Sequence, residues 1–197
     1  MKPRVPSGFT LLEVLITVVI FSIGLLGLAG LQVKGLTLAQ DSLLRTTATL
    51  LANDMADRMR ANMRAAQMGV SSPYNNPTGL EAGNPSCMGK DNVGQPVDTR
   101  CTPLEMASHD FYEWHGLLKG LKATNWHAAM NAQLPSSNGI VCIDSTPNDG
   151  TPTNPQCDNV SVNSNLSIFT IKIWWQERKL NQSNQYTVHS YITSIAL

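Results

Sequence analysis

A single carboxylate stands in the most apolar part of this sequence. Glu13 is the only charged residue between Phe9 and Val33, where most of the other side chains are aliphatic or aromatic. A charge at membrane depth is costly, and it becomes tolerable when it meets a partner of opposite charge. Glu13 is therefore predicted to pair with an amine.

Four cysteines, Cys87, Cys101, Cys142 and Cys157, offer either disulfide or metal chemistry. Three pairings are possible. Closure of short loops favours Cys87–Cys101 and Cys142–Cys157, because each loop has about fifteen residues and each bond contributes roughly 3 kcal/mol in the chain-entropy model. The Cys-x-x-Cys spacing that zinc sites commonly use does not occur. The sequence therefore predicts two disulfides and no zinc site.

The segment His109–His115 combines imidazole and carboxylate side chains in the order HDFYEWH. Its two histidines are six positions apart, so they do not share a helix face in the way that the ligands of His-Glu-x-x-His do. Asp110 and Glu113 lie between them. All four are expected to be polar surface residues of an amphipathic helix.

A second acidic group, formed by Asp144, Asp149 and Asp158 with Gly150, is similar to a calcium loop, but its spacing misses the EF-hand pattern. The sequence contains no nucleophile elbow, no phosphate-binding loop and no pair of catalytic carboxylates. We therefore expect no catalytic residue, no cofactor and no metal, and the chain is not expected to be an enzyme.

The apolar segment 9–33 is long enough to cross a membrane. Residues 14–31 include only two polar side chains, which meets the usual threshold for a transmembrane helix. Lys2 and Arg4 precede the segment, so the positive-inside rule places the N-terminus in the cytoplasm and the rest of the chain outside. A signal peptide cleaved near Ala29 is one alternative. A plain signal anchor is another, but it leaves the carboxylate unexplained.

The overall composition agrees with a membrane anchor and excludes one large class of function. The length of 197 residues predicts one domain, with or without an appendage. Only 14% of the residues are charged, against about 25% in an average soluble domain. The 14 basic and 14 acidic side chains cancel, whereas a general nucleic-acid binder carries a basic excess. No nucleic-acid partner is therefore expected.

The heptapeptide Ser7–Glu13, SGFTLLE, resembles the prepilin cleavage signature of type IV pilins and type II secretion pseudopilins. That signature is a short basic leader ending in glycine, followed by phenylalanine and by glutamate at the fifth position after the cut. The resemblance implies that prepilin peptidase cuts between Gly8 and Phe9 and that the new amine of Phe9 is N-methylated. It also implies that Glu13 pairs with the Phe9 amine of a neighbouring subunit, which would offset the cost of both charges in an apolar bundle.

Helical periodicity continues beyond the apolar segment. Apolar residues at three- or four-residue steps define one stripe of an amphipathic helix: Leu44, Ala48, Leu51, Met55, Met59 and Met63. Positions 7–72 contain no proline, so one helix from about Thr10 to Gln67 is predicted, and it should end near Gly69.

Four segments are expected from this pattern. Residues 1–8 form a leader, and residues 9–33 form a helix in the membrane or filament core. Residues 34–68 continue that helix in amphipathic form, and residues 69–197 form a periplasmic globular head with two loop regions.

The head is expected to be α+β, with a small antiparallel sheet packed on the end of the long helix. A helix is predicted from Leu104 to Leu134, with Gly116 and Gly120 as points where it can break. Its apolar side is predicted to consist of Phe111, Trp114, Leu118 and Leu121. Three strands are predicted at Ile140–Asp144, Ile168–Trp175 and Gln185–Ile195. The second strand alternates as a strand with one buried face does, and the polar residues that follow it suggest a hairpin.

Features of the head follow the order seen in PilV-type minor pilins, and the resemblance extends over most of the chain. They are Asp110 with Trp114, Leu134-Pro135, Gly139–Val141, the loop between Cys142 and Cys157, and Ile171–Trp175. The resemblance implies a minor pilin that helps prime, assemble or modify the type IV pilus. It implies other minor and major pilins, prepilin peptidase and the inner-membrane assembly machinery as partners, with one pass through the inner membrane and incorporation into the pilus. A pilus-tip adhesin and a type II secretion pseudopilin are the alternatives.

Overall fold

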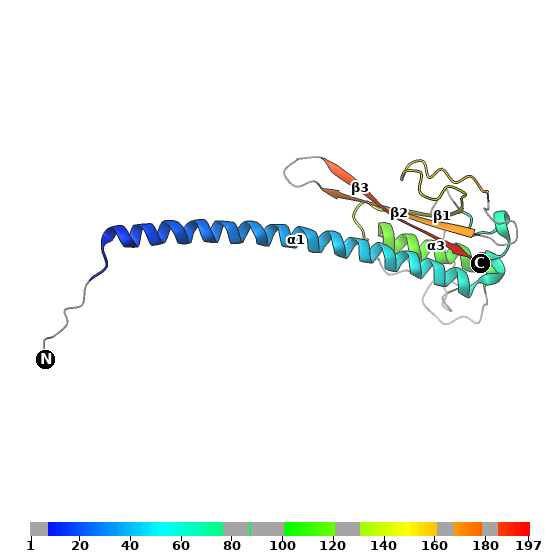
Figure 1. Ribbon diagram of the computed structural model, residues 1–197. Coiled ribbons are helices and arrows are strands. Elements are labelled where there is room, and N and C mark those ends of the chain that lie inside the picture. The colour runs from blue at the N-terminus through cyan, green and yellow to red at the C-terminus, as the bar shows by residue number, and fades with distance from the viewer. Residues whose placement is uncertain (1–7, 77–86, 88–100, 121–130, 161–167, 179–184) are drawn as a thin grey trace. The chain divides into compact units, whose positions relative to one another are not determined.

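The computed structural model has an α+β architecture and describes residues 8–76, 87, 101–120, 131–160, 168–178 and 185–197. Its elements in chain order are α1 (Leu11–Ala61), α2 (Met63–Ala66), the 3₁₀ helix η1 (Gly69–Ser71), α3 (Pro103–Lys119), β1 (Asn138–Ile143), β2 (Ile168–Arg178) and β3 (Tyr186–Ala196) (Figure 1). The chain divides into two compact units, Met1–Leu43 and Leu44–Leu197. We call the second of these the head unit.

Helix α1 contributes residues to both units. Its part in the head unit buries six small or flexible apolar side chains: Ala48, Leu51, Ala52, Met55, Ala56 and Met59. Leu44 is partly buried against the same core. The apolar stripe predicted from the sequence is thus confirmed as far as Met59, because a period of 3.6 residues places these side chains on one face of the helix.

The predicted continuation of one helix to Gln67 is wrong. Helix α1 ends at Ala61, and the backbone of Asn62 leaves the helical region at φ −111° and ψ 50°. The side-chain amide of Asn62 donates hydrogen bonds to the Pro103 carbonyl at 2.7 Å and to the Tyr74 hydroxyl at 3.2 Å. Such contacts compete with regular helix geometry at an asparagine. The interruption changes the helical register, and Met63, predicted for the buried stripe, is 38% exposed.

The sheet of the head unit has three antiparallel strands in the order β1-β2-β3. Strand β2 lies in the centre, and its register with β3 runs from Ile168 opposite Ala196 to Arg178 opposite Tyr186. All three predicted strands are present with shifted ends. The residues that join β2 to β3 lie outside the described part of the chain.

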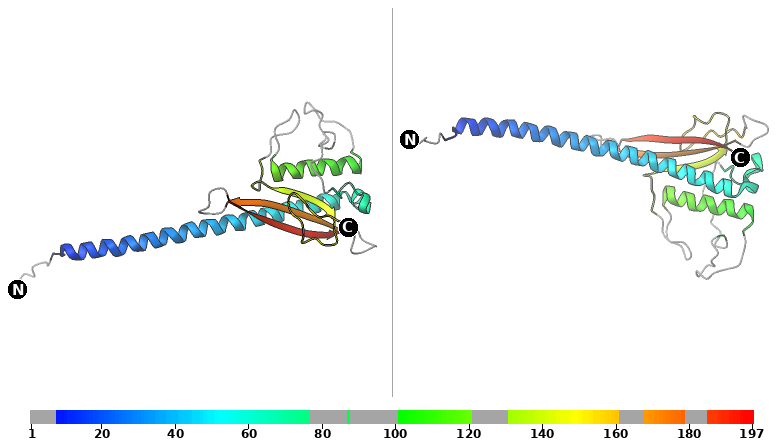
Figure 2. Two further views of the ribbon diagram at one scale, coloured as in Figure 1. Left: turned by 90° about the horizontal axis from the view of Figure 1, so that it is seen from above. Right: turned by 60° about the horizontal axis from the view of Figure 1, so that its bottom comes forward.

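One face of the sheet packs on the helices. Figures 1 and 2 show α3 and the head-unit part of α1 on this side, and the segment that follows β1 on the other. The helix-facing residues of β2 are all buried: Phe169, Ile171, Ile173 and Trp175. Helix α3 approaches β1 so closely that a Cβ atom on Gly139 would lie 2.4 Å from Leu118 Cδ1 and 2.6 Å from Trp114 Cη2. A side chain at position 139 would therefore force Leu118 and Trp114 to shift.

The opposite face of β2 is buried as well, contrary to the prediction of a half-buried strand. Thr170 and Lys172 are fully buried and Trp174 is 3% exposed. A second apolar cluster on this face joins Trp174 to Ile140 and Cys142. The sequence pattern alone missed this because the cover comes from a segment without regular structure.

Residues that favour the start and the end of a helix stand at both ends of α3. Thr102 and Glu105 form a reciprocal capping box, and Pro103 occupies the first turn. At the other end Gly120 adopts φ 79°, which ends the helix at Lys119. The break allowed at Gly120 is therefore confirmed, whereas the predicted extension to Leu134 is wrong. Leu134 is buried outside any helix, and Leu121 lies outside the described residues.

Candidate functional site

The N-terminal segment begins the helix with a side-chain cap. Gly8, Phe9 and Thr10 precede α1, and the Glu13 amide donates to the Thr10 carbonyl at 3.1 Å and to the Thr10 hydroxyl at 3.3 Å. Glu13 thus occupies the third position of the first turn, where the helix dipole favours a negative charge. The cap explains how a carboxylate can sit at the start of an apolar helix, but it neutralises no charge.

Within the described residues the Glu13 carboxylate has neither a hydrogen-bond nor an ion-pair partner. Phe9 is 84% exposed, and the large apolar side chains that follow it in α1 as far as Leu43 are exposed as well. Helix α1 is long and apolar enough to cross a membrane. An isolated chain in water cannot bury this surface, so the segment requires lipid or other helices around it.

A cluster of charged side chains connects α1 to α3 inside the head unit. The Arg58 guanidinium donates to Asp54 at 2.9 Å and to Glu113 at 2.8 Å, and its Nη1 lies 3.4 Å from Asp110. The Tyr74 hydroxyl donates to the other oxygen of Asp110. These contacts hold the two helices together through groups that the sequence separates by more than fifty positions.

The prediction that this part of α3 is a polar surface is therefore wrong. His109, Asp110 and His115 are each no more than 6% exposed. Hydrogen bonds from His109 and Arg58 lower the pKa of the Glu113 carboxyl to about 2, although burial opposes them. Burial raises the pKa of Asp110 against the opposing effects of Tyr74 and Arg58. Arg58, Asp110, Glu113 and Tyr74 thus provide hydrogen-bond partners for one another, which gives the cluster a role in packing.

His115 belongs to a separate contact between α3 and β1. Its Nε2 lies 2.8 Å from the Gly139 carbonyl, and because a carbonyl only accepts, Nε2 carries the proton. Its Nδ1 is buried and has no hydrogen-bond partner in the described part of the chain. Burial lowers the pKa of His115 to about 4, so the ring is neutral at pH 7.

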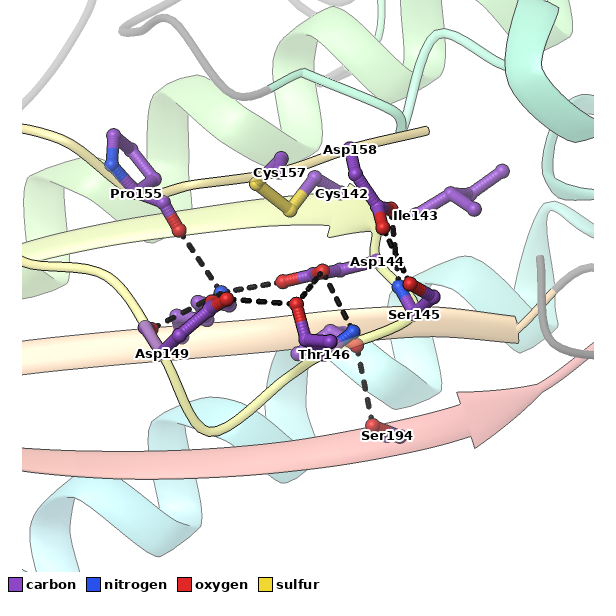
Figure 3. A network of polar contacts seen from close by, with 12 residues as sticks. Cys142, Ile143, Asp144, Ser145, Thr146, Asp149, Pro155, Cys157, Asp158 and Ser194 are labelled. Carbon is purple, nitrogen blue, oxygen red and sulfur yellow. Dashed lines mark hydrogen bonds and ion pairs between the residues drawn. A yellow bond between two sulfur atoms is a disulfide. The ribbon is translucent and has the colours of Figure 1, made fainter. Parts of the chain in front are cut away.

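The segment between Cys142 and Cys157 crosses the outer face of the sheet, and we call it the stapled loop. A disulfide joins its ends, with the two Cα atoms 6.1 Å apart. Figure 3 shows Asp144, Asp149 and the Pro155 carbonyl turned towards one another beneath the loop. They surround the ammonium of Lys172, which reaches them from β2.

Sequence reasoning named the acidic residues of this loop but missed Lys172. Asp144 and Asp149 both contact Lys172. Asp158 instead accepts hydrogen bonds from the amide and the hydroxyl of Ser145. A lysine within the apolar strand sequence Ile171–Trp175 was the available signal, because an isolated buried ammonium needs a carboxylate.

The second disulfide joins Cys87 to Cys101, with the Cα atoms 5.3 Å apart. Cys101 lies immediately before Thr102, the residue that caps α3. This bond therefore attaches Cys87 near the start of α3. Most of the loop it closes lies outside the described residues.

Comparison with known proteins gives two family matches. Residues 4–29 match the prokaryotic N-terminal methylation motif, and residues 30–112 match the family described as type IV pilin Tt1218. No curated protein and no solved structure matches the chain. The two matches meet within α1, and the second ends within α3.

We expect the free energy of unfolding of the head unit to decrease as the pH is lowered from about 6.5 to about 4. The folded-state pKa of His115 is about 4 against 6.5 for the free side chain, so the unfolded chain binds more protons in this window. At pH values below this window, the total loss in the free energy of unfolding is at most roughly 3 kcal/mol. Urea unfolding of the full chain in detergent at a series of pH values measures it. His115→Gln keeps an N–H donor for Gly139 without titrating, and equal pH slopes for both chains would contradict the assignment.

Peptide mapping without reduction should join the Cys87 peptide to that of Cys101, and the Cys142 peptide to that of Cys157. Both Cα separations lie in the range that a disulfide spans without moving the backbone. The chain should be isolated from membranes, with a reduced and alkylated sample as control. Crossed pairs or free thiols would show that the pairing is wrong.

Proposed function

Since the chain is a type IV pilin-like protein, we propose that it is a minor pilin. In this role it helps to prime, assemble or modify the pilus by packing its N-terminal helix against other pilins. The proposed role is structural and involves no catalysis by this chain. Prepilin peptidase and the inner-membrane assembly machinery are the other expected partners.

The main support comes from Glu13 on the exposed apolar helix. The carboxylate occupies the first turn without a partner among the described residues, beside a strongly exposed Phe9. A free amine at Phe9 of a neighbouring chain would supply the missing charge. Two paired charges in an apolar bundle offset much of each other's desolvation cost, whereas one alone does not. Glu13 would thus act as the docking residue.

The proposed location is the bacterial inner membrane, crossed once by the first part of α1. Lys2 and Arg4 support a cytoplasmic N-terminus by the positive-inside rule, which would leave the head unit in the periplasm. Two disulfides agree with that oxidising compartment. Incorporation into the pilus would then transfer the helix from lipid to a bundle of similar helices.

A binding subunit at the pilus tip is the second candidate, and the stapled loop favours it. The loop exposes small polar residues, among them Thr151, Thr153 and Asn154. Its attachment by the Cys142–Cys157 disulfide restrains these residues before any ligand arrives, which reduces the entropy lost on binding. A head that serves only assembly does not need such a surface.

Prepilin peptidase is expected to cut after Gly8. Mass spectrometry of the mature N-terminus should find N-methylated Phe9. The same chain expressed without the peptidase is the control, and it should retain residues 1–8. A mature start near Leu31 would indicate ordinary signal peptidase and would contradict the proposal.

Glu13→Ala should leave membrane insertion and cleavage intact, because it makes the helix more apolar. It should reduce co-purification with other pilins from membranes by about tenfold or more. Glu13→Lys should reduce it further, because it sets two like charges against each other. Ser22→Ala is the matched control, since the Ser22 hydroxyl already donates to Val18 within the same helix. Equal recovery of wild type and all three variants would show that Glu13 does not guide docking.

A further inference from the structure

The ammonium of Lys172 is enclosed by oxygen atoms. Its Nζ lies 2.5 Å from Asp144 Oδ2, 3.0 Å from Asp149 Oδ1, 2.9 Å from the Pro155 carbonyl and 3.2 Å from the Asp149 carbonyl. The side chains of Lys172 and Asp144 are fully buried. Two carboxylates and two backbone carbonyls thus converge on one point beneath the stapled loop (Figure 3).

This set of oxygens is the kind that binds a hard cation. Calcium takes carboxylate and carbonyl oxygens in flexible geometry, with water completing the six to eight ligands. Lys172 brings one positive charge to two carboxylates, so the group retains one negative charge. Asp149 is 35% exposed, which gives solvent access to that side of the group.

We propose that Asp144, Asp149 and the Pro155 carbonyl form a cation cage whose resident cation is the Lys172 ammonium, and that the cage binds calcium once that ammonium is removed. In the natural chain the ammonium occupies the position of a metal and repels a second cation. The stapled loop therefore holds its structure without metal. This inference does not depend on the proposed role in the pilus.

The backbone of the loop is arranged to bring the Pro155 carbonyl into the cage. Gly150 adopts φ 87°, and a Cβ atom there would lie 2.3 Å from that carbonyl oxygen. The Thr151 amide donates to the Asn154 carbonyl at 2.8 Å, which closes the turn between them. A side chain at position 150 would displace a ligand of the cage.

The carboxylates of the cage are oriented by hydrogen bonds that do not involve the lysine. The Thr146 amide donates to Asp144 Oδ1 at 3.0 Å, and the Thr146 hydroxyl donates to Asp149 Oδ2 at 2.7 Å. Each of these contacts uses the carboxylate oxygen that is not the one paired with Lys172. The Cys142–Cys157 disulfide holds the two ends of the stapled loop together. These contacts are therefore expected to return the oxygens to the same positions once another cation replaces the ammonium.

Lys172→Ala in the full chain, held in detergent micelles, tests the cage. With a chelator present, amides of residues 145–157 should exchange hydrogen at least about tenfold faster than in wild type, because two carboxylates lose their counter-charge. Millimolar calcium should restore protection and raise the Tm by about 5 °C. Propylammonium, which resembles the removed part of the side chain, should also restore protection, whereas tetramethylammonium, which has no N–H donor, should not.

Two controls separate the cage from simple loss of packing. Wild type should show the same exchange and the same Tm in calcium and in chelator. The double variant Lys172→Ala/Asp144→Asn removes one negative charge together with the ammonium, so it should fold without added cation and respond less to calcium. The proposal is overturned if Lys172→Ala is unfolded or unprotected in every cation. Equal destabilisation of the single and double variants, or a calcium response in wild type, would overturn it as well.

Discussion

Burial of β2 on both faces is the constraint on which the head unit depends. A three-stranded sheet needs its apolar side chains covered, and helices α1 and α3 cover only one side. The other side carries Lys172, whose burial is tolerable only with carboxylates around it. The stapled loop supplies those carboxylates together with apolar cover for Trp174. One irregular segment thus meets both the electrostatic and the apolar requirement of the central strand.

A positive charge is also surrounded by carboxylates on the helical side of the head unit. Arg58 carries the positive charge between α1 and α3, and Asp54, Asp110 and Glu113 surround it. Removing Arg58 would cost more than the cluster contributes as a whole, because the buried Asp110 would lose its cation. Neutral His115 avoids that cost by donating to a carbonyl. Polar groups therefore determine how α3 sits on its neighbours, while apolar burial supplies the driving force.

The first unit, in contrast to the head unit, does not bury its own apolar side chains. Its apolar residues are exposed in the isolated chain, and the carboxylate of Glu13 has no partner among the described residues. The described part of the head unit buries a core of its own, whereas this segment becomes stable only in lipid or among other helices. The proposed assembly through the N-terminal helix would depend on this difference, because a helix whose apolar surface and charge were already satisfied within its own chain would gain little free energy by binding a neighbour.

The sequence by itself determined the features that depend on local spacing. The apolar helix, the buried stripe of α1 up to Met59 and the three strands follow from periodicity and backbone preference, which act over a few residues. For the end of α3 the sequence offered only two glycines, Gly116 and Gly120, where the helix could break. Only the tertiary structure decided the break at Asn62, whose amide bonds to Pro103, and the burial of Lys172. Both depend on partners far along the chain or in an irregular loop. Local pattern carries no information about such partners, since their positions exist only once the chain has folded.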